Sequence, residues 1–142
     1  MMFTLRRQVE FQHCDPAGIV FYPRYFEMIS AAVERFFTDH LGKSFAEMHL
    51  TEKFGVPTAR IEVDFRSPSR LEDWLDLSVA VARVGRSSVE LAITCACAGT
   101  PRFEARSTLV YVDLTTGKPR SWPDGLRAAL GSELTESETQ DV

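Results

Sequence analysis

Residues 13–25 of this chain have the sequence HCDPAGIVFYPRY, and they mark the change from a strand pattern to a helical pattern. Residues 15–18, DPAG, fit a type I turn, because Asp is favoured at its first position, Pro at its second and Gly at its fourth. Pro23 fits the first position of a helix, where a backbone N–H would have no partner anyway. This order predicts that the Asp15 carboxylate lies close to a helix N-terminus, where unpaired N–H groups make the electrostatic potential positive.

The one long helix is predicted at residues 23–41, with Gly42 as its C-terminal stop. Its apolar residues form a wide stripe, which indicates that a sheet covers the helix. The stripe consists of Tyr25, Ile29, Ala32, Val33 and Phe36, with Phe26 and Phe37 beside it. A further short helix is predicted at residues 44–50, with Ser44 as its cap and Glu47 completing a capping box.

Strand patterns, in which apolar and polar residues alternate, lie on both sides of the helix. Before it, a half-buried strand is predicted, with an apolar face made of Phe3, Leu5, Val9 and Phe11. After Gly55 the alternation continues in four segments with short connections, which predicts an antiparallel meander. These segments are 61–65, 75–81, 89–97 and 103–111, and a short helix is predicted at 123–130. The predicted fold is therefore α+β, with one long helix packed on a curved five-stranded antiparallel sheet.

Length and composition are those of one globular domain, with 142 residues, 44% of them hydrophobic and 25% charged. We assign residues 1–132 to that domain and expect the polar, acidic segment 133–142 to be disordered. The net charge of −4 gives no global signal for nucleic-acid binding. No run approaches the roughly 18 apolar residues of a membrane span, so no membrane association is predicted.

The first seven residues already alternate between apolar and polar types, so they are not interpreted as a signal peptide. Three cysteines are an odd number, which argues against a disulfide framework and favours a cytoplasmic location. A single five-stranded sheet with one helix leaves an edge strand and apolar surface open. Pairing with a second copy covers both, so a homodimer is expected.

The segment Asp15–Tyr25 closely resembles the signature of the 4-hydroxybenzoyl-CoA thioesterase family of hotdog-fold proteins, D-x-A-G-[IV]-V-[FYW]-[YH]. Three further segments are similar to that family: 65–73 to its linker between the second and third strands, 85–88 to its next hairpin, and 117–120 to its C-terminal segment. The resemblance covers roughly residues 3 to 130. His13 is a departure, since many relatives have an acidic residue there.

The resemblance implies a hotdog fold, in which the sheet wraps around the long helix, and dimers that often pair into tetramers. It implies hydrolysis of an acyl- or aroyl-CoA thioester without a metal or bound cofactor, at an active site in the dimer interface. The family's catalytic carboxylate corresponds to Asp15. Its oxyanion-binding backbone N–H corresponds to that of Tyr22.

Thioester hydrolysis requires a base or nucleophile and a donor for the oxyanion that forms on the carbonyl. Asp15 can act as general base or attack directly to form a mixed anhydride, and the sequence leaves both open. The CoA phosphates need cations and hydroxyls, for which the candidates are Arg83, Arg86, Ser87 and Ser88, with Arg70 and Arg120 as weaker ones. Thr58 and Tyr25 are candidates to contact the acyl group, although Tyr25 also fits a core position.

Other readings of these residues remain open. An Asp at the start of a Pro-Gly turn also occurs for turn geometry alone. A thioesterase for acyl groups on acyl carrier protein would be supported by a basic rim, because that carrier is acidic, and a non-catalytic acyl-CoA-binding protein is a further alternative. The consecutive side chains of residues 13–15 diverge in an extended chain, and Cys95 and Cys97 lack C-x-x-C spacing, so no metal site is predicted. No His is placed like the base of the hotdog dehydratases.

Overall fold

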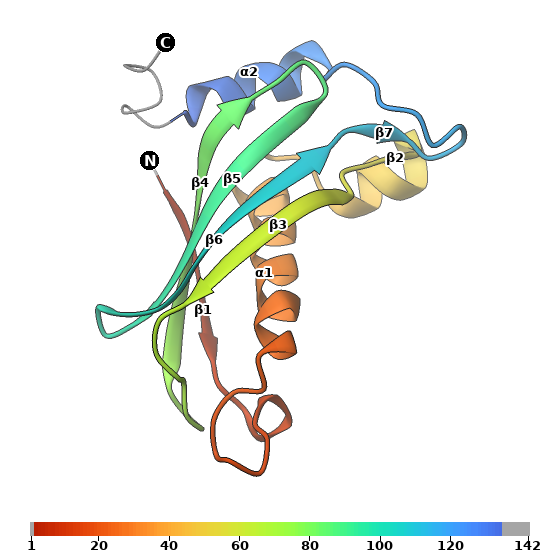
Figure 1. The fold of residues 1–142 in the computed structure, drawn as a ribbon. Coiled ribbons are helices and arrows are strands. Elements are labelled where there is room, and N and C mark those ends of the chain that lie inside the picture. The colour runs from red at the N-terminus through yellow and green to blue at the C-terminus, as the bar shows by residue number, and fades with distance from the viewer. Residues whose placement is uncertain (1, 135–142) are drawn as a thin grey trace.

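A computed structural model describes residues 2–134 of the chain. One long helix lies against one face of a curved five-stranded sheet, as Figure 1 shows. The helical elements are η1 (Phe11–His13), α1 (Pro23–Arg35), η2 (Phe36–His40), η3 (Glu47–Glu52) and α2 (Asp124–Ser132). The strands are β1 (Phe3–Gln8), β2 (Phe54–Gly55), β3 (Thr58–Phe65), β4 (Trp74–Val84), β5 (Ser88–Cys97), β6 (Thr100–Val110) and β7 (Val112–Asp113). The predicted α+β class is confirmed.

The order of strands in the main sheet is β1-β4-β5-β6-β3, and every neighbouring pair is antiparallel. Strands β4, β5 and β6 form the predicted meander. The prediction was wrong for β3, because this strand does not lie beside β4 but pairs with β6 at the far edge of the sheet. Residues 66–73 connect the two strands and are long enough to cross from that edge to β4. Alternation identifies a strand but not its neighbour.

The predicted apolar stripe of the helix is buried against the sheet. Tyr25, Ile29, Ala32 and Val33 are all buried in α1, and Met28 joins them. The helix continues to His40 as the π-helical turn η2, in which Phe36 and Phe37 are fully buried. Gly42 then takes a positive φ of 77°, a conformation that glycine adopts without a steric penalty, and the helix ends.

The first strand is shorter than predicted. β1 ends at Gln8, and Phe11 lies in the 3-10 turn η1, where its side chain is 85% exposed. Val9 is buried as predicted, but its N–H and C=O bond to the backbone of residues 72–73, beyond the ladder of β1 with β4. The alternation of apolar and polar residues continues through Phe11, but it does not show where the chain leaves its partner strand. The predicted strand was therefore too long.

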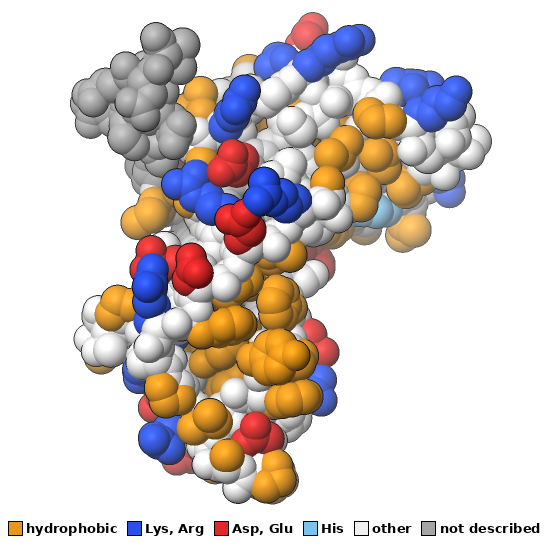
Figure 2. All heavy atoms as spheres, viewed as in Figure 1, with side chains coloured by type: hydrophobic (Ala, Val, Ile, Leu, Met, Phe, Trp, Pro, Cys, Tyr) orange, Lys and Arg blue, Asp and Glu red, His pale blue; other side chains and the backbone are white. Residues whose placement is uncertain are grey.

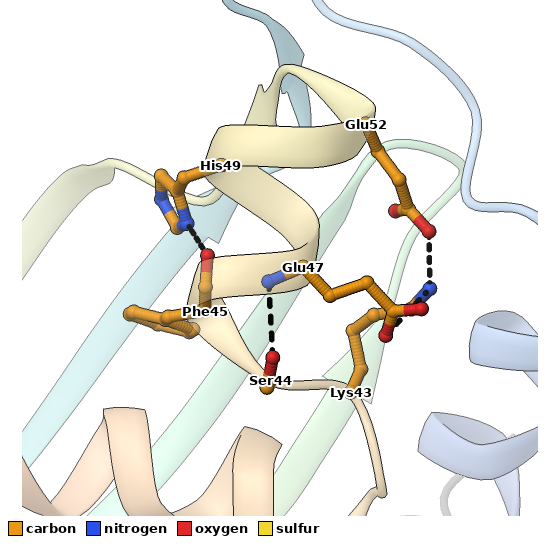
Figure 3. A network of polar contacts seen from close by, with 6 residues as sticks. All are labelled: Lys43, Ser44, Phe45, Glu47, His49 and Glu52. Atoms are coloured by element: carbon orange, nitrogen blue, oxygen red, sulfur yellow. Dashed lines mark hydrogen bonds and ion pairs between the residues drawn. The ribbon is translucent and has the colours of Figure 1, made fainter.

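The short helix after Gly42 is present, and half of its predicted capping box forms. The Ser44 hydroxyl accepts a hydrogen bond from the Glu47 N–H at 3.0 Å, as Figure 3 shows. The Glu47 carboxylate instead lies 3.7 Å from the Lys43 ammonium group. Near the C-terminus, the Glu133 carboxylate bonds to the His40 ring at 2.8 Å and Leu134 forms a bridge with Val81. The remainder of the expected tail, residues 135–142, lies outside the described residues.

Within residues 2–134, no helix is both long enough and apolar enough to cross a membrane.

Candidate active site

Residues 13–22, which we call the Asp15 loop, form a small antiparallel ladder that leads into α1. The Asp15 N–H donates to the Ile19 carbonyl at 3.0 Å, and the Phe21 N–H donates to the His13 carbonyl at 2.9 Å. The predicted turn closes this ladder, with the Gly18 N–H donating to the Asp15 carbonyl at 2.9 Å. Gly18 has a φ of 82°, so an L side chain would be strained at this corner.

The Asp15 carboxylate is half-buried, and one of its oxygens stabilises the turn. Oδ1 accepts a hydrogen bond from the Ala17 N–H at 2.8 Å, which fixes the direction of the side chain. No other described residue forms a hydrogen bond or ion pair with the carboxylate. The turn therefore uses one oxygen of Asp15 and leaves the second available to a ligand.

The start of α1 leaves one backbone donor beside this carboxylate's loop. Pro23 has no N–H, and the N–H groups of Arg24 and Tyr25 donate to the carbonyls of Phe21 and Tyr22 at 2.8 and 3.1 Å. Among the described residues, none accepts a hydrogen bond from the Tyr22 N–H. The positive end of the helix is thus presented mainly by the Tyr22 N–H, the donor that sequence reasoning selected.

Three partly exposed aromatic side chains flank the loop. Phe21, Tyr22 and Phe65 are 46%, 59% and 47% exposed, and Tyr22 meets the other two rings edge-on. Figure 2 shows apolar side chains gathered on this lower part of the surface. Tyr25 lies behind them with only 4% of its surface exposed, and its hydroxyl donates to Ser69 Oγ at 2.8 Å. In the single chain Tyr25 is therefore a core residue, and its contact with an acyl group stays a prediction.

A hollow of about 760 Å³ lies at the opposite end of the molecule from the Asp15 loop. We call it the arginine pocket. It is lined by Lys43, Glu52, Phe54, Arg86, Ser87, Tyr111, Pro119, Arg120, Ser121 and Pro123. The Arg86 Nε donates to Ser121 Oγ at 2.8 Å, and the rings of Phe54 and Tyr111 stack with centroids 4.9 Å apart. Cations, hydroxyls and an aromatic face therefore meet in one hollow.

Lys43 is held in this pocket by a carboxylate. Its Nζ lies 2.7 Å from the Glu52 carboxylate, as Figure 3 shows. The hydrogen bond that Lys43 donates to the Glu52 carboxylate raises the pKa of Lys43 above its usual value, so the ammonium group stays charged at neutral pH.

The predicted CoA-binding residues are divided by the structure. Arg86 and Ser87 line the arginine pocket with Arg120, whereas Arg83 and Ser88 are not among its lining residues. Arg83 is exposed opposite Glu90, and the Ser88 carbonyl accepts a hydrogen bond from Trp122 Nε1. Arg70 is exposed in the 66–73 connection, at the other end of the chain's sheet.

Sequence reasoning missed Lys43, Glu52, Phe54 and Ser121 as pocket residues. They come from the segment after the helix and from the C-terminal segment, and no local motif links these segments to Arg86. Contact between the distant segments is visible only in the tertiary structure.

The Asp15 loop and the arginine pocket lie at opposite ends of one chain: in Figure 1 the loop before α1 is at one end, and β2 and β7, beside which the pocket's lining residues Phe54 and Tyr111 lie, are at the other. Strand β3 runs from one to the other. It begins at the exposed Thr58, next to Pro57, whose carbonyl accepts the Val110 N–H at 3.1 Å. It ends at Phe65, which contacts Tyr22. One chain therefore does not bring Thr58 or the arginines to Asp15.

His13 and Cys95 have local environments that differ from a catalytic or metal-binding one. The His13 Nδ1 accepts a hydrogen bond from the Glu10 N–H at 2.8 Å, so the ring is held within η1, where it lines a hollow of about 430 Å³ with Arg6 and Trp74. Burial raises the pKa of the Cys95 thiol to about 12, which leaves it without thiolate character at neutral pH. Residues 2–134 contain no group of three or more His, Cys, Asp or Glu side chains arranged to hold a metal ion.

Comparison with known proteins identifies the family and the fold. The model of the thioesterase-like superfamily matches residues 9–130. A search of curated proteins finds no match. Among solved structures, a 1,4-dihydroxy-2-naphthoyl-CoA thioesterase from Synechocystis is 20% identical, with a TM-score of 0.84 over 92% of this chain and 96% of its own.

Two further solved structures are similar. The gentisyl-coenzyme A thioesterase BH1999 is 24% identical, with a TM-score of 0.81 over 89% of this chain and 98% of its own. A hypothetical protein from Staphylococcus aureus in complex with CoA is 16% identical, with a TM-score of 0.87 over 95% of this chain and 87% of its own. At these identities the likeness establishes the fold.

The fold is therefore the predicted hotdog fold of the thioesterases. The superfamily model matches residues 9–130, which are most of the chain, so the chain belongs to the thioesterase-like superfamily. Membership of the narrower 4-hydroxybenzoyl-CoA thioesterase family stays a prediction.

Proposed function

We propose that this protein hydrolyses an acyl- or aroyl-CoA thioester to the free acid and coenzyme A. The observation that supports this most directly is the Asp15 loop: among residues 2–134, one Asp15 carboxylate oxygen and the helix-start N–H of Tyr22 have no hydrogen-bond partner. These are the two groups that thioester hydrolysis requires. Membership of the thioesterase-like superfamily supports the same reaction class.

Two routes fit these groups. In the first, the free oxygen of Asp15 takes a proton from water while the water oxygen attacks the thioester carbonyl carbon. In the second, that oxygen attacks the carbon itself and forms a mixed anhydride, which water then hydrolyses. In both, the Tyr22 N–H donates to the oxyanion of the tetrahedral intermediate, and the C–S bond breaks to release the CoA thiolate, which takes up a proton. One such donor contributes on the order of 3 kcal/mol to transition-state stabilisation.

The arginine pocket is the proposed site for the phosphorylated nucleotide of CoA. Arg86 and Arg120 are there with the hydroxyls of Ser87 and Ser121. A guanidinium group can bind phosphate through two parallel hydrogen bonds, whereas the ammonium group of lysine acts as a point charge. The similar fold of a protein solved in complex with CoA supports this choice of substrate carrier.

A complete site then requires two chains, which supports the predicted homodimer. The outer edge of β3 has no partner strand among the described residues. In a two-fold symmetric dimer, the β3 strands of the two chains can pair edge to edge. The pairing is antiparallel, so the two strands run in opposite directions. This pairing brings the Thr58 end of one chain, with its arginine pocket, toward the Phe65 end and Asp15 loop of the partner. Further pairing into a tetramer is the family expectation.

The test is thiol release from a panel of aroyl- and aliphatic acyl-CoA esters by wild type and Asp15→Asn. We expect turnover by wild type and a fall of at least about 100-fold in the variant. Asp39→Asn is a matched control, since Asp39 forms a surface pair with Arg35 at 3.6 Å far from the loop. Equal rates in Asp15→Asn and wild type would remove Asp15 from the mechanism.

Acyl carrier protein is the second candidate carrier, because the cations that line the arginine pocket also suit an acidic partner. Acyl groups on carrier protein are therefore assayed beside the CoA esters. Turnover of the carrier-bound esters alone would favour this candidate. Tight binding of acyl-CoA without turnover of either substrate would favour the non-catalytic alternative.

A further inference from the structure

A buried pair of hydroxyl groups joins α1 to the connection between β3 and β4. The Tyr25 hydroxyl donates to Ser69 Oγ at 2.8 Å. Ser69 has no exposed surface and Tyr25 has 4%. Water therefore cannot replace this bond without a rearrangement, and burial raises the pKa of the Tyr25 hydroxyl, which keeps it protonated as a donor.

Both residues of this pair also bind the Asp15 loop through their backbones. The Ser69 carbonyl accepts the Val20 N–H at 2.9 Å, and the neighbouring residues Ile19 and Arg70 form a bridge. Ile19 in turn accepts the Asp15 N–H. On the other side, the Tyr25 N–H donates to the Tyr22 carbonyl. Tyr25 and Ser69 thus connect the part of the loop that holds Asp15 with the part that presents the Tyr22 N–H.

The connection that contains Ser69 is itself fixed to the sheet. The Asp73 carboxylate accepts the Arg70 N–H at 2.9 Å and lies 3.6 Å from the Arg102 guanidinium. The Arg102 Nη1 donates to Ser67 Oγ at 2.9 Å on the other side of Ser69. Ser69 is therefore held between two anchored neighbours, so the Tyr25 hydroxyl binds a fixed point and not a mobile segment.

We propose that Tyr25 and Ser69 are positioning residues for the hydrolysis, and that their hydroxyl pair sets the place of Asp15 relative to the Tyr22 N–H. This inference rests on the proposed function. Both side chains are buried beneath the loop, so both act through it. It gives Tyr25 a role different from the acyl contact expected for it.

The first test removes the hydroxyls one at a time. Tyr25→Phe keeps the ring, and we expect kcat to fall about 10- to 100-fold while KM changes less than about threefold, because small misplacements of reacting groups have effects of this size. Ser69→Ala should give a similar fall, and the double variant should be no slower than the slower single variant, since both remove one bond. Ser107→Ala removes the hydroxyl of the other buried serine, on β6, and should keep wild-type kcat.

The second test asks whether the pair acts through Asp15. Adding Tyr25→Phe to Asp15→Asn should lower the residual rate no further. A purely structural defect would instead lower that rate by the same factor as it lowers the wild-type rate. Amide hydrogen exchange gives a readout without activity. The Val20 N–H should exchange at least about fivefold faster in Tyr25→Phe and in Ser69→Ala than in wild type, and at the wild-type rate in Ser107→Ala.

Three results would overturn the inference: wild-type kcat in both Tyr25→Phe and Ser69→Ala, multiplicative combination with Asp15→Asn, or a rise in KM without a fall in kcat. The last result would return Tyr25 to a substrate-binding role. The failure of the proposed function is distinguishable, since it appears as wild-type turnover by Asp15→Asn. Tyr25→Phe and Ser69→Ala each remove the same hydrogen bond, so one of them is a sufficient test if the other does not fold.

Discussion

The two ends of the molecule differ in how they are assembled. The Asp15 loop is made of ten consecutive residues, 13–22, held by backbone hydrogen bonds among themselves and to Ser69. The arginine pocket draws its lining from segments around Lys43, Arg86 and Arg120 that are far apart in the chain. In the proposed function, the chemical step belongs to this local motif and recognition of the carrier to a tertiary surface. We therefore expect mutations to affect the two functions separately, because the two regions lie at opposite ends of the sheet.

The largest effect should come from the loop. We expect Asp15→Asn to lower kcat at least about 100-fold with KM nearly unchanged, because the amide can neither accept the proton of water nor attack the carbonyl. Steady-state kinetics on the best CoA ester measure both parameters. A large rise in KM with full kcat would place Asp15 in binding and erase the contrast between the two ends.

The pocket should show the opposite pattern. The double substitution Arg86→Gln and Arg120→Gln should raise KM for CoA esters about 10- to 50-fold and leave kcat within about threefold, since each lost phosphate contact is worth roughly 1 kcal/mol or more. The same variant should treat acyl-pantetheine esters, which lack the nucleotide, like wild type. Equal losses on both substrates would contradict a nucleotide site in this pocket.

Mixing these two variants tests whether one site uses both chains. When the two variants are mixed in equal amounts, unfolded and refolded, about half of the dimers contain one chain of each variant. In such a mixed dimer, one of the two sites has Asp15 from one chain and both arginines from the other. About a quarter of wild-type activity at low substrate should return, at least roughly fivefold above the average of the two parent variants. Activity equal to that average would mean that each site lies within one chain.

The smallest effect concerns the core that separates the two ends. Burial raises the pKa of the Cys95 thiol from 9.0 to about 12. Between these values the unfolded chain has lost this proton and the folded chain has kept it, so the free energy of unfolding falls as pH rises, by up to about 1.4 kcal/mol per pH unit. The effect is half of its maximum near pH 9 and fades below about pH 8.

Denaturant unfolding at pH 8.5 to 11 measures this slope. Cys95→Ala should reduce it, whereas Cys97→Ala, at a half-buried position on the same strand, should leave it as in wild type. An unchanged slope in Cys95→Ala would show that the thiol is not sequestered by the sheet.

Prediction from the sequence succeeded where the information is local. The turn at Asp15, the helix start at Pro23 and the buried stripe that includes Ile29 all follow from residue preferences within a few positions, and the structure has each of them. The strand that was extended to Phe11 and the meander that included β3 were wrong, because alternation within a strand does not report its partner.

The sequence by itself determined the class of the fold and the residues that are available for chemistry. Periodicity defines which face of each element is apolar, and the Asp-Pro-Ala-Gly turn before a proline-started helix fixes a carboxylate and an N–H on one loop. Only the tertiary structure decided that β3 takes the edge of the sheet, that Lys43 and Phe54 join Arg86 in one pocket, and that this pocket lies at the other end of the chain from Asp15. These outcomes depend on contacts between residues distant in sequence, whose energies no local pattern encodes.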